Sequence, residues 1–147
     1  MEFIRYSGFE KMPAEELYEV LKLRQDIFII EQTCIYDDID GRDAQSHHLL
    51  LKKSDSLAAY SRIVPPGEKF DNVSIGRIVV HKKFRGRGLG KKIVIESIKW
   101  IREMGYDQVV IEAQAHLQKF YGELGFEATS EIYDEDGIPH LQMTRNL

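Results

Sequence analysis

The chain has 147 residues, of which 43% are hydrophobic and 30% charged, with a formal net charge of -4 and a pI near 5.7. This composition predicts one folded domain over residues 1–147 and excludes a disordered or membrane-spanning chain. The acidic balance argues against a nucleic-acid partner, because proteins that bind nucleic acid carry a basic face. The single cysteine and a first segment without the apolar core of a signal peptide predict a cytoplasmic protein.

Hydrophobic periodicity and turn residues divide the chain into helices and strands in mixed order. Pro13 suits the first turn of a helix, and the β-branched run VSIGRIVVH indicates a central strand. The elements expected are a helix over residues 13–31, a polar loop over 35–46, a hairpin over 47–53 and 57–64, a strand over 73–81, a helix over 89–104, a strand over 108–114, a short helix over 116–124, and two strands over 126–133 and 139–146. This order predicts an α/β or α+β sheet with helices on both faces.

A basic, glycine-rich segment separates the strand over 73–81 from the helix over 89–104. Residues 82–92 hold six lysines and arginines and no acidic residue. Backbone N–H groups at the start of a helix have no partner inside it, and glycines at 86, 88 and 90 allow an anion to approach them. Arg85, Arg87 and Lys91 add charge-assisted contacts. The segment predicts a phosphate or pyrophosphate cradle, against the simpler interpretation of a turn with solvated lysines.

Two common phosphate-binding motifs do not fit this segment. A Walker A loop needs glycine where Arg85 stands and a hydroxyl where Lys92 stands. The dinucleotide fingerprint fails because Lys91 occupies its third glycine position. The pattern R-x-x-G-x-G between a strand and a helix instead resembles the pyrophosphate loop of the GNAT superfamily of acyl-CoA-dependent N-acetyltransferases. The resemblance implies acetyl-CoA as co-substrate, held by Arg85, Gly86, Arg87, Gly88, Leu89, Gly90 and Lys91.

The segment AQAHLQKFYGELGF, residues 113–126, resembles a later signature of the same superfamily. The resemblance implies that Tyr121 protonates the leaving CoA thiolate and that Phe120 and Gln114 lie against the cofactor. Gln114 stands where many relatives have asparagine. A phenol is a neutral proton donor near pH 7, which suits that role. The alternative is that Tyr121 is a core aromatic beside Phe120.

Five further stretches, FIIEQTCIYDDIDGRD, AAYSRI, IGRIVV, EAQAHLQKFY and EDGIPHLQM, resemble the ElaA-like branch of this superfamily. The resemblance implies a central mixed, mostly antiparallel twisted sheet with a splayed cofactor slot. It implies acetyl transfer to a primary amine, on a small molecule or a protein, by direct attack in a ternary complex. Peptide groups of Ile78, Val79 and Val80 would bind the pantetheine arm as an added strand would.

The base that deprotonates the amine is not fixed by the sequence. The candidates are Glu112, His81, His116 and His140, and His116 is preferred because it precedes the helix that carries Tyr121. Acidic residues at 37, 38, 40 and 43 and at 134–136 would attract a cationic amine if both loops border the acceptor slot, and are otherwise exposed turns.

Other functions remain open on the sequence alone. The chain could be a non-catalytic acyl-CoA sensor, or a ping-pong enzyme that carries the acyl group on Cys34, although a buried inert thiol is the simpler interpretation. The loop DDIDGRD fails the calcium-binding pattern and no zinc-ligand spacing occurs, so no metal is expected. Edge strands near the C-terminus would allow a homodimer.

Overall fold

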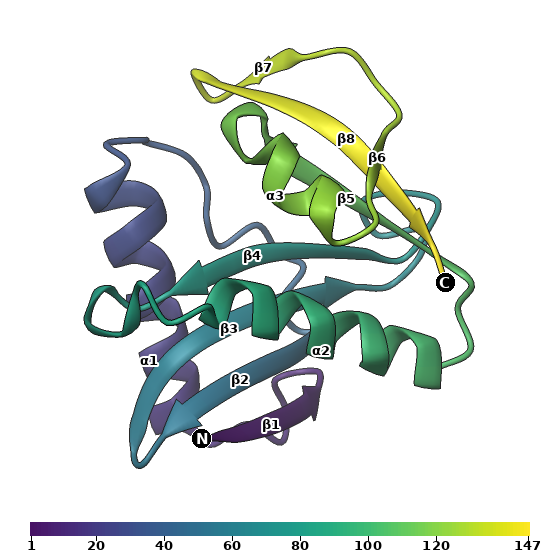
Figure 1. The fold of residues 1–147 in the computed structure, drawn as a ribbon. Helices are drawn as coiled ribbons and strands as arrows, with labels where there is room; N and C mark the ends of the chain where they lie inside the picture. Colours follow the sequence, from purple (N-terminus) through teal and green to yellow (C-terminus); the bar gives the residue numbers. More distant parts are fainter.

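A computed structural model describes all 147 residues and contains one eight-stranded sheet with helices on both faces (Figure 1). The strands are β1 (Glu2–Ser7), β2 (His47–Lys53), β3 (Ser56–Val64), β4 (Ser74–Val80), β5 (Gln108–Gln114), β6 (Glu127–Ala128), β7 (Tyr133–Glu135) and β8 (Ile138–Asn146). The helices are α1 (Ala14–Arg24), the π-helix η1 (Gln25–Glu31), the 3-10 helix η2 (Lys82–Phe84), α2 (Leu89–Glu103), the 3-10 helix η3 (Ala115–Leu117) and α3 (Gln118–Glu123). None of these helices combines the length and apolar character needed to cross a membrane.

The sheet has the order β1-β2-β3-β4-β5-β8-β6, with β7 paired to β8. Only β4 and β5 run parallel, and α2 forms the crossover between them. All other neighbours pair antiparallel, and tight turns join β2 to β3 and β7 to β8. The predicted mixed, mostly antiparallel sheet is therefore confirmed.

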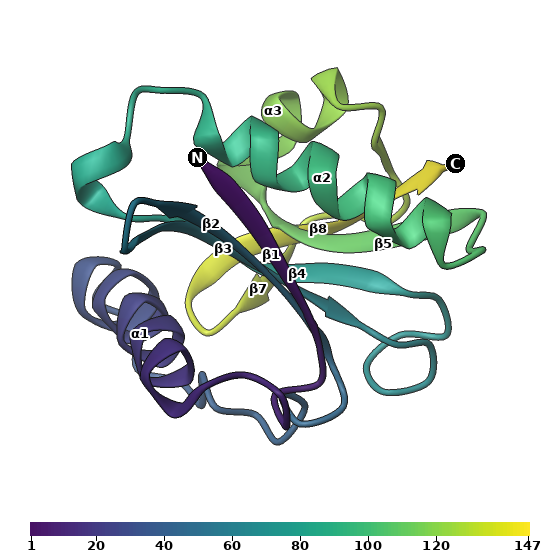
Figure 2. The ribbon, with the colours of Figure 1, turned by 90° about the horizontal axis from the view of Figure 1, so that it is seen from below.

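The helices lie in two layers, with α1 on one face of the sheet and α2 and α3 on the other (Figure 2). Three successive leucines of β2 show how one strand serves both layers. Leu49 and Leu51 pack into the cluster under α2, whereas Leu50 packs into the cluster under α1. This alternation follows from the two-residue period of a strand, and it explains why strands covered on both faces are apolar throughout.

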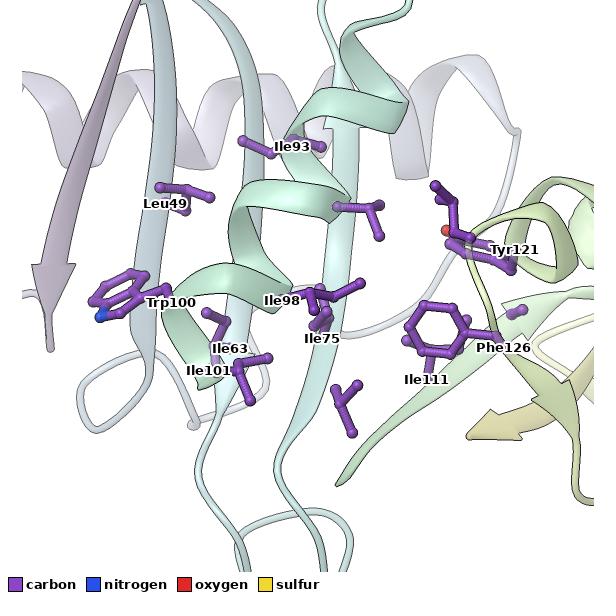
Figure 3. Close-up of a cluster of buried hydrophobic side chains, with 14 of the residues drawn as sticks. Leu49, Ile63, Ile75, Ile93, Ile98, Trp100, Ile101, Ile111, Tyr121 and Phe126 are labelled. Carbon is purple, nitrogen blue, oxygen red and sulfur yellow. The ribbon is translucent and has the colours of Figure 1, made fainter. Parts of the chain in front are cut away.

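The larger core lies between the sheet and α2 and α3 (Figure 3). Helix α2 contributes Ile93, Ile98 and Ile101 from one stripe, and Tyr121 and Phe126 close the cluster over β5. Gly105 and Gly125 end the two helices with φ of +93° and +89°, a left-handed conformation that glycine adopts without strain. The predicted helices over 89–104 and 116–124 are confirmed within one or two residues.

Three regions differ from the sequence-based expectation. The helix predicted over 13–31 ends at Glu31, but its last seven residues form a π-helix. The alternating first residues form the edge strand β1. The single strand predicted over 126–133 is wrong, because only Glu127–Ala128 and Tyr133–Glu135 pair with β8. Between them Ser130 Oγ accepts the hydrogen bond from Gln142 N at 2.8 Å, so a side chain replaces the backbone ladder.

A buried ion network fixes the loop over residues 35–46 to the sheet. Arg24 is fully buried and donates to Asp38 Oδ2 at 3.0 Å and to Asp43 Oδ1 at 2.7 Å. Arg62 of β3 donates to the same Asp43 oxygen at 3.0 Å and to Asp40 Oδ2 at 2.7 Å. The network joins the end of α1, the loop and the centre of the sheet, and each charge has an opposite partner, as burial requires.

Replacing Arg24 with methionine should lower the free energy of unfolding by about 3–5 kcal/mol, because it leaves the buried carboxylates of Asp38 and Asp43 with only one cation each, Arg77 and Arg62. The matched control is Lys22→Met on the same helix, whose exposed i,i+4 pair with Asp26 should contribute almost nothing. Chemical denaturation of both variants measures the difference. Equal stabilities would contradict the role given to the network.

The free energy of unfolding, measured as a function of pH, gives a second test of the network. Burial alone raises the pKa of Asp43, but the hydrogen bond and charge of Arg24 outweigh it and hold the pKa below its ordinary value. A depressed carboxyl pKa contributes stability that is complete above the ordinary value of about 3.9 and is lost as the pH falls through the folded-state value. The acid loss of stability should be smaller in Arg24→Met than in the wild type.

Candidate active site

Strands β4 and β5 separate soon after they meet, which opens the sheet (Figure 1). Their parallel pairing is limited to Ser74 with Val110 and Ile75 with Ile111. The register of β4 against β3 shifts next to this point, and Arg77 there has a φ of +49°. A bulge of this kind bends a strand and increases its twist. Beyond Ile75, the edge of β4 that faces β5 therefore has no strand paired with it. A splayed slot between β4 and β5 results.

A cavity of 580 Å³ lies on the side of the slot bordered by the loop over 35–46 and the β7–β8 hairpin. Its floor includes Ile78 of β4 and Ile111 of β5, and Tyr121 lines it from α3. The residues that line it with titratable side chains are Cys34, Tyr36, Asp37, Asp40, Arg42, Arg62, Lys69, Arg77, Glu112, His116, Tyr121, Glu135, Asp136 and His140.

A second cavity of 170 Å³ lies at the N-terminus of α2. It is lined by Val80, Phe84, Phe120 and most of the glycine-rich loop, namely Arg85, Gly86, Gly88, Leu89, Gly90 and Lys91. Gly86 and Gly88 have φ of +78° and +72°, and a Cβ atom added at either would meet no atom within 4 Å. The loop thus turns through left-handed conformations and leaves open space above its backbone, which is the geometry of an anion site at a helix N-terminus.

The cations of the glycine-rich segment differ in their partners. Arg85 forms a two-pronged ion pair with Glu31, with N–O distances of 2.8 and 2.6 Å, and Lys82 Nζ lies 3.5 Å from the same carboxylate. The hydrogen bond from Arg85 is the main reason that the pKa of Glu31 is lowered. Arg87 lies over the ring of Phe84 at 5.6 Å. The loop is therefore tied to the end of η1 by Arg85, a link that the sequence pattern does not contain.

Neighbouring residues on two elements line different cavities. Ile78 lines the large cavity and Val80 the small one, as alternate residues on one face of β4 do. Val79 between them is buried under α1, so only its peptide group could reach a ligand in the slot. On α3, Phe120 lines the small cavity and Tyr121 the large one. The two cavities are therefore lined by neighbouring residues of α3 and of the open edge of β4.

Tyr121 is 7% exposed and makes edge-to-face contacts with Phe120 and Phe126 at 5.1 and 6.0 Å (Figure 3). Its ring belongs to the core, while the residue also lines the large cavity. The ring is therefore a core aromatic beside Phe120, and the role of Tyr121 as proton donor stays a prediction. Burial raises the pKa of Tyr121 to about 12, which keeps the phenol protonated at neutral pH.

The candidate bases are not equally placed. Glu112 and His140, on paired strands, and the exposed His116 line the large cavity. His81 lies outside it, where its Nδ1 accepts the hydrogen bond from Lys83 N at 3.1 Å. Tyr133 donates to Glu112 Oε2 at 2.5 Å. Tyr133 could not be singled out from the sequence, because its contact with Glu112 depends on the pairing of β8 with β5.

Two contacts cross from the end of η1 to the other border of the slot. Gln114 Nε2 donates to Gln32 Oε1 at 3.2 Å, and Cys34 Sγ donates to the carbonyl oxygen of Asp136 at 3.4 Å. Burial raises the pKa of the Cys34 thiol, with a smaller contribution from Asp136. A thiol that is held protonated is a poor nucleophile, so the environment of Cys34 does not favour an acyl-cysteine intermediate.

The two acidic loops both border the large cavity, with different roles for their residues. Asp38 and Asp43 face inward to arginines, whereas Asp37, Glu135 and Asp136 are exposed at the rim. The four cations that line the cavity all have carboxylate partners: Arg42, Arg62 and Arg77 pair with Asp40, and Lys69 pairs with Glu112. The uncompensated charge at the rim is therefore negative. No three potential metal ligands are grouped around one point.

The buried phenol gives a direct test of the site's environment. The ¹³Cζ resonance of Tyr121, assigned by comparison with Tyr121→Phe, should keep its phenol shift until the pH approaches 12, about two units above the ordinary tyrosine value of about 10. The physical reason is the cost of burying a phenolate. A transition near the ordinary value would show that the ring is open to solvent.

A family profile and curated sequence relatives match nearly the whole chain. The sequence profile of the acetyltransferase (GNAT) domain matches residues 13–147. Protein ElaA of Escherichia coli is 39% identical over 140 residues, covering 93% of this chain and 92% of that protein. A UPF0039 protein of Synechocystis is 42% identical over 140 residues, covering 94% and 91%.

Solved structures agree with the sequence relatives. An acyl-CoA N-acyltransferase from Pseudomonas aeruginosa matches with a TM-score of 0.90 and 35% identity over 99% of both chains. The crystal structure of E. coli ElaA matches with a TM-score of 0.89 and 36% identity over 98% of both. A GNAT acetyltransferase from Elizabethkingia anophelis, solved with acetyl-CoA bound, shares the fold with a TM-score of 0.70 and 18% identity, covering 99% and 98%. The chain thus belongs to the GNAT family of acetyltransferases, with ElaA among its relatives, and is a GNAT-type acyltransferase.

Proposed function

We propose that this protein transfers an acetyl group from acetyl-CoA to a primary amine by direct attack in a ternary complex. The observation that carries the proposal is that two cavities are lined by neighbouring residues along the open edge of β4 and on α3, where Tyr121 lines one and Phe120 the other. One cavity has the backbone geometry of an anion site, and the other is large enough for an acceptor. A thioester reaching from the first cavity would present its acyl carbon to the second.

The cofactor end of the site uses backbone more than side chains. The glycine-rich loop, with Arg87 and Lys91, would hold the diphosphate of acetyl-CoA at the N-terminus of α2. Peptide groups of residues 78–80 would pair with the pantetheine arm along the open edge of β4. Arg85 would join the diphosphate contacts from its position beside Glu31. Acetyl-CoA bound in the related fold from E. anophelis supports this choice of co-substrate.

The acceptor end of the site favours a positively charged molecule. Exposed carboxylates at Asp37, Glu135 and Asp136 would attract an ammonium ion to the rim and oppose an anionic acceptor. After the amine loses a proton to a base, its nitrogen attacks the acetyl carbon and the C–S bond breaks. Tyr121 would then protonate the leaving thiolate, because a buried neutral phenol is a donor at the point where negative charge develops.

A cytoplasmic location and a homodimer are further parts of the proposal. Cys34 is a free thiol that donates a hydrogen bond, in keeping with a reducing compartment. The short strands β6 and β7 lie at the edge of the sheet, where they could pair with a second chain. Cellular fractionation tests the location, and light scattering tests the homodimer. Neither measurement depends on the activity.

Filling the small cavity should block cofactor binding. A Cβ at Gly90 would lie 3.8 Å from Phe120 Cζ and from Val80 Cγ2, so Gly90→Val fits the helix but occupies the space above the loop. Calorimetry should show that the dissociation constant of acetyl-CoA rises at least about tenfold. Lys99→Val places the same β-branched side chain at an exposed position of the same helix, outside both cavities, and should bind normally. Normal binding by Gly90→Val would place the diphosphate elsewhere.

Thiol release from acetyl-CoA with a panel of primary amines (putrescine, ethanolamine, glycinamide and a lysine-containing peptide) tests the whole reaction. The wild type should release CoA in the presence of at least one amine. Tyr121→Phe should lower kcat about 10²-fold and leave acetyl-CoA affinity unchanged, because it removes a proton donor and keeps the ring. Tyr106→Phe, at a partly buried tyrosine that packs against the same core outside both cavities, is the matched control. Acetyl-CoA binding without turnover of any amine would contradict the proposal.

A further inference from the structure

His140 lies in β8 and lines the large cavity. Its Nδ1 is 2.7 Å from the carbonyl oxygen of Ile138. A carbonyl oxygen can only accept a hydrogen bond, so Nδ1 carries the proton and the neutral ring has its lone pair on Nε2. No group of the chain hydrogen-bonds Nε2. The backbone of the β7–β8 hairpin thus fixes the tautomer that can accept a proton.

The ring of His140 is also fixed by its neighbours. Tyr133 of β7 stacks on it, with ring centroids 6.5 Å apart and an interplanar angle of 25°. The hydroxyl of Tyr133 in turn donates to Glu112 Oε2, while Lys69 donates to Glu112 Oε1 at 3.2 Å. This chain of contacts joins β7, β5 and the loop before β4, and it holds a carboxylate near the imidazole.

Glu112 is better suited to stabilise a charged histidine than to take the proton itself. Burial alone raises its pKa, but the hydrogen bond from Tyr133 and the charge of Lys69 bring it below the ordinary value. The charge of a protonated His140 lowers the same pKa, so the two side chains are within electrostatic reach. A carboxylate with both oxygens engaged and a lowered pKa is a weak base, so Glu112 is the poorer proton acceptor of the two.

The remaining titratable groups around the cavity place no fixed cation against His140. Glu135 and Asp136, in and after β7, line the cavity with carboxylates. His116 of η3 lines it too, but no hydrogen bond or ring contact fixes its side chain. Of the histidines at the cavity, only His140 has both a fixed tautomer and a fixed ring.

We propose that Nε2 of His140 is the base that takes the ammonium proton of the acceptor, with Tyr133 and Glu112 as positioning residues. The inference rests on the proposed amine acetylation and deepens it. The N–H bond of the ammonium breaks and its proton moves to Nε2, which gives an imidazolium beside Glu112. The neutral nitrogen then forms the C–N bond, the C–S bond breaks, and the thiolate takes the proton of Tyr121. The second amine proton restores Tyr121 through water, and His140 returns its proton to solvent.

The test compares His140→Gln with the wild type on putrescine and glycinamide, two amines that differ in basicity. Glutamine keeps an N–H donor for the Ile138 carbonyl but cannot act as a base. We expect kcat/KM to fall about 10²–10⁴-fold with acetyl-CoA affinity unchanged. In the wild type, the acidic limb of kcat/KM should lie at the same pH for both amines, and it should be absent in His140→Gln. If the fall of kcat/KM at low pH came from protonation of the acceptor amine, its midpoint pH would differ between the two amines.

Two further variants separate a catalytic role from a structural one. Added imidazole should restore turnover to His140→Ala, which a purely structural role would not permit. His47→Gln, outside the cavity, is the control and should keep the wild-type profile. Long-range ¹H–¹⁵N spectra of the wild-type protein should show the proton of the neutral ring of His140 on Nδ1, a readout that needs no acceptor.

Several results would overturn the inference without touching the proposed function. These are an acidic limb retained in His140→Gln, a limb lost in His116→Gln instead, or a proton found on Nε2 in the neutral ring. If the wild type turns over none of the panel amines, the proposed function fails first, and the imidazole spectra still report on the tautomer.

Discussion

The early separation of β4 from β5 is the feature on which the rest of the site depends. Parallel pairing stops after Ile75 and Ile111, and the bulge at Arg77 turns β4 away. A non-glycine residue with positive φ is strained and persists only where its surroundings hold it. Arg77 is held by ion pairs with Asp38 at 2.8 Å and Asp40 at 3.5 Å. The buried charges therefore stabilise the opening as well as the loop over 35–46.

This arrangement assigns different physical tasks to the two sides of the slot. The α2 side offers backbone amides and open space above glycines, which suit a flexible anionic cofactor. The other side is built from side chains of distant segments, joined by contacts such as Cys34 with Asp136. The cofactor site is thus local in sequence, whereas the acceptor site depends on the tertiary fold.

Because the cofactor site is local in sequence and the acceptor site is not, the sequence predicted the first more completely than the second. Elements with a strong period or a glycine stop, such as α2 and the loop before it, were predicted closely because local physics decides them. The bulge at Arg77 was missed, although an isolated Gly76 inside a strand is a signal for one. The broken strand over 126–133 was missed because Ile132 is exposed and only Phe126 anchors the segment. The partners of Glu112 could not be predicted, since Tyr133 and Lys69 reach it only through the long-range pairing of β5 with β8 and β4.

Hydrogen exchange of the backbone amides, with and without acetyl-CoA, tests most directly whether the open edge of β4 receives the cofactor. The account predicts slower exchange in residues 76–80 and 85–90 when acetyl-CoA is bound, and no change in β1 at the far edge of the sheet. Binding that leaves the exchange of residues 76–80 unchanged would contradict it.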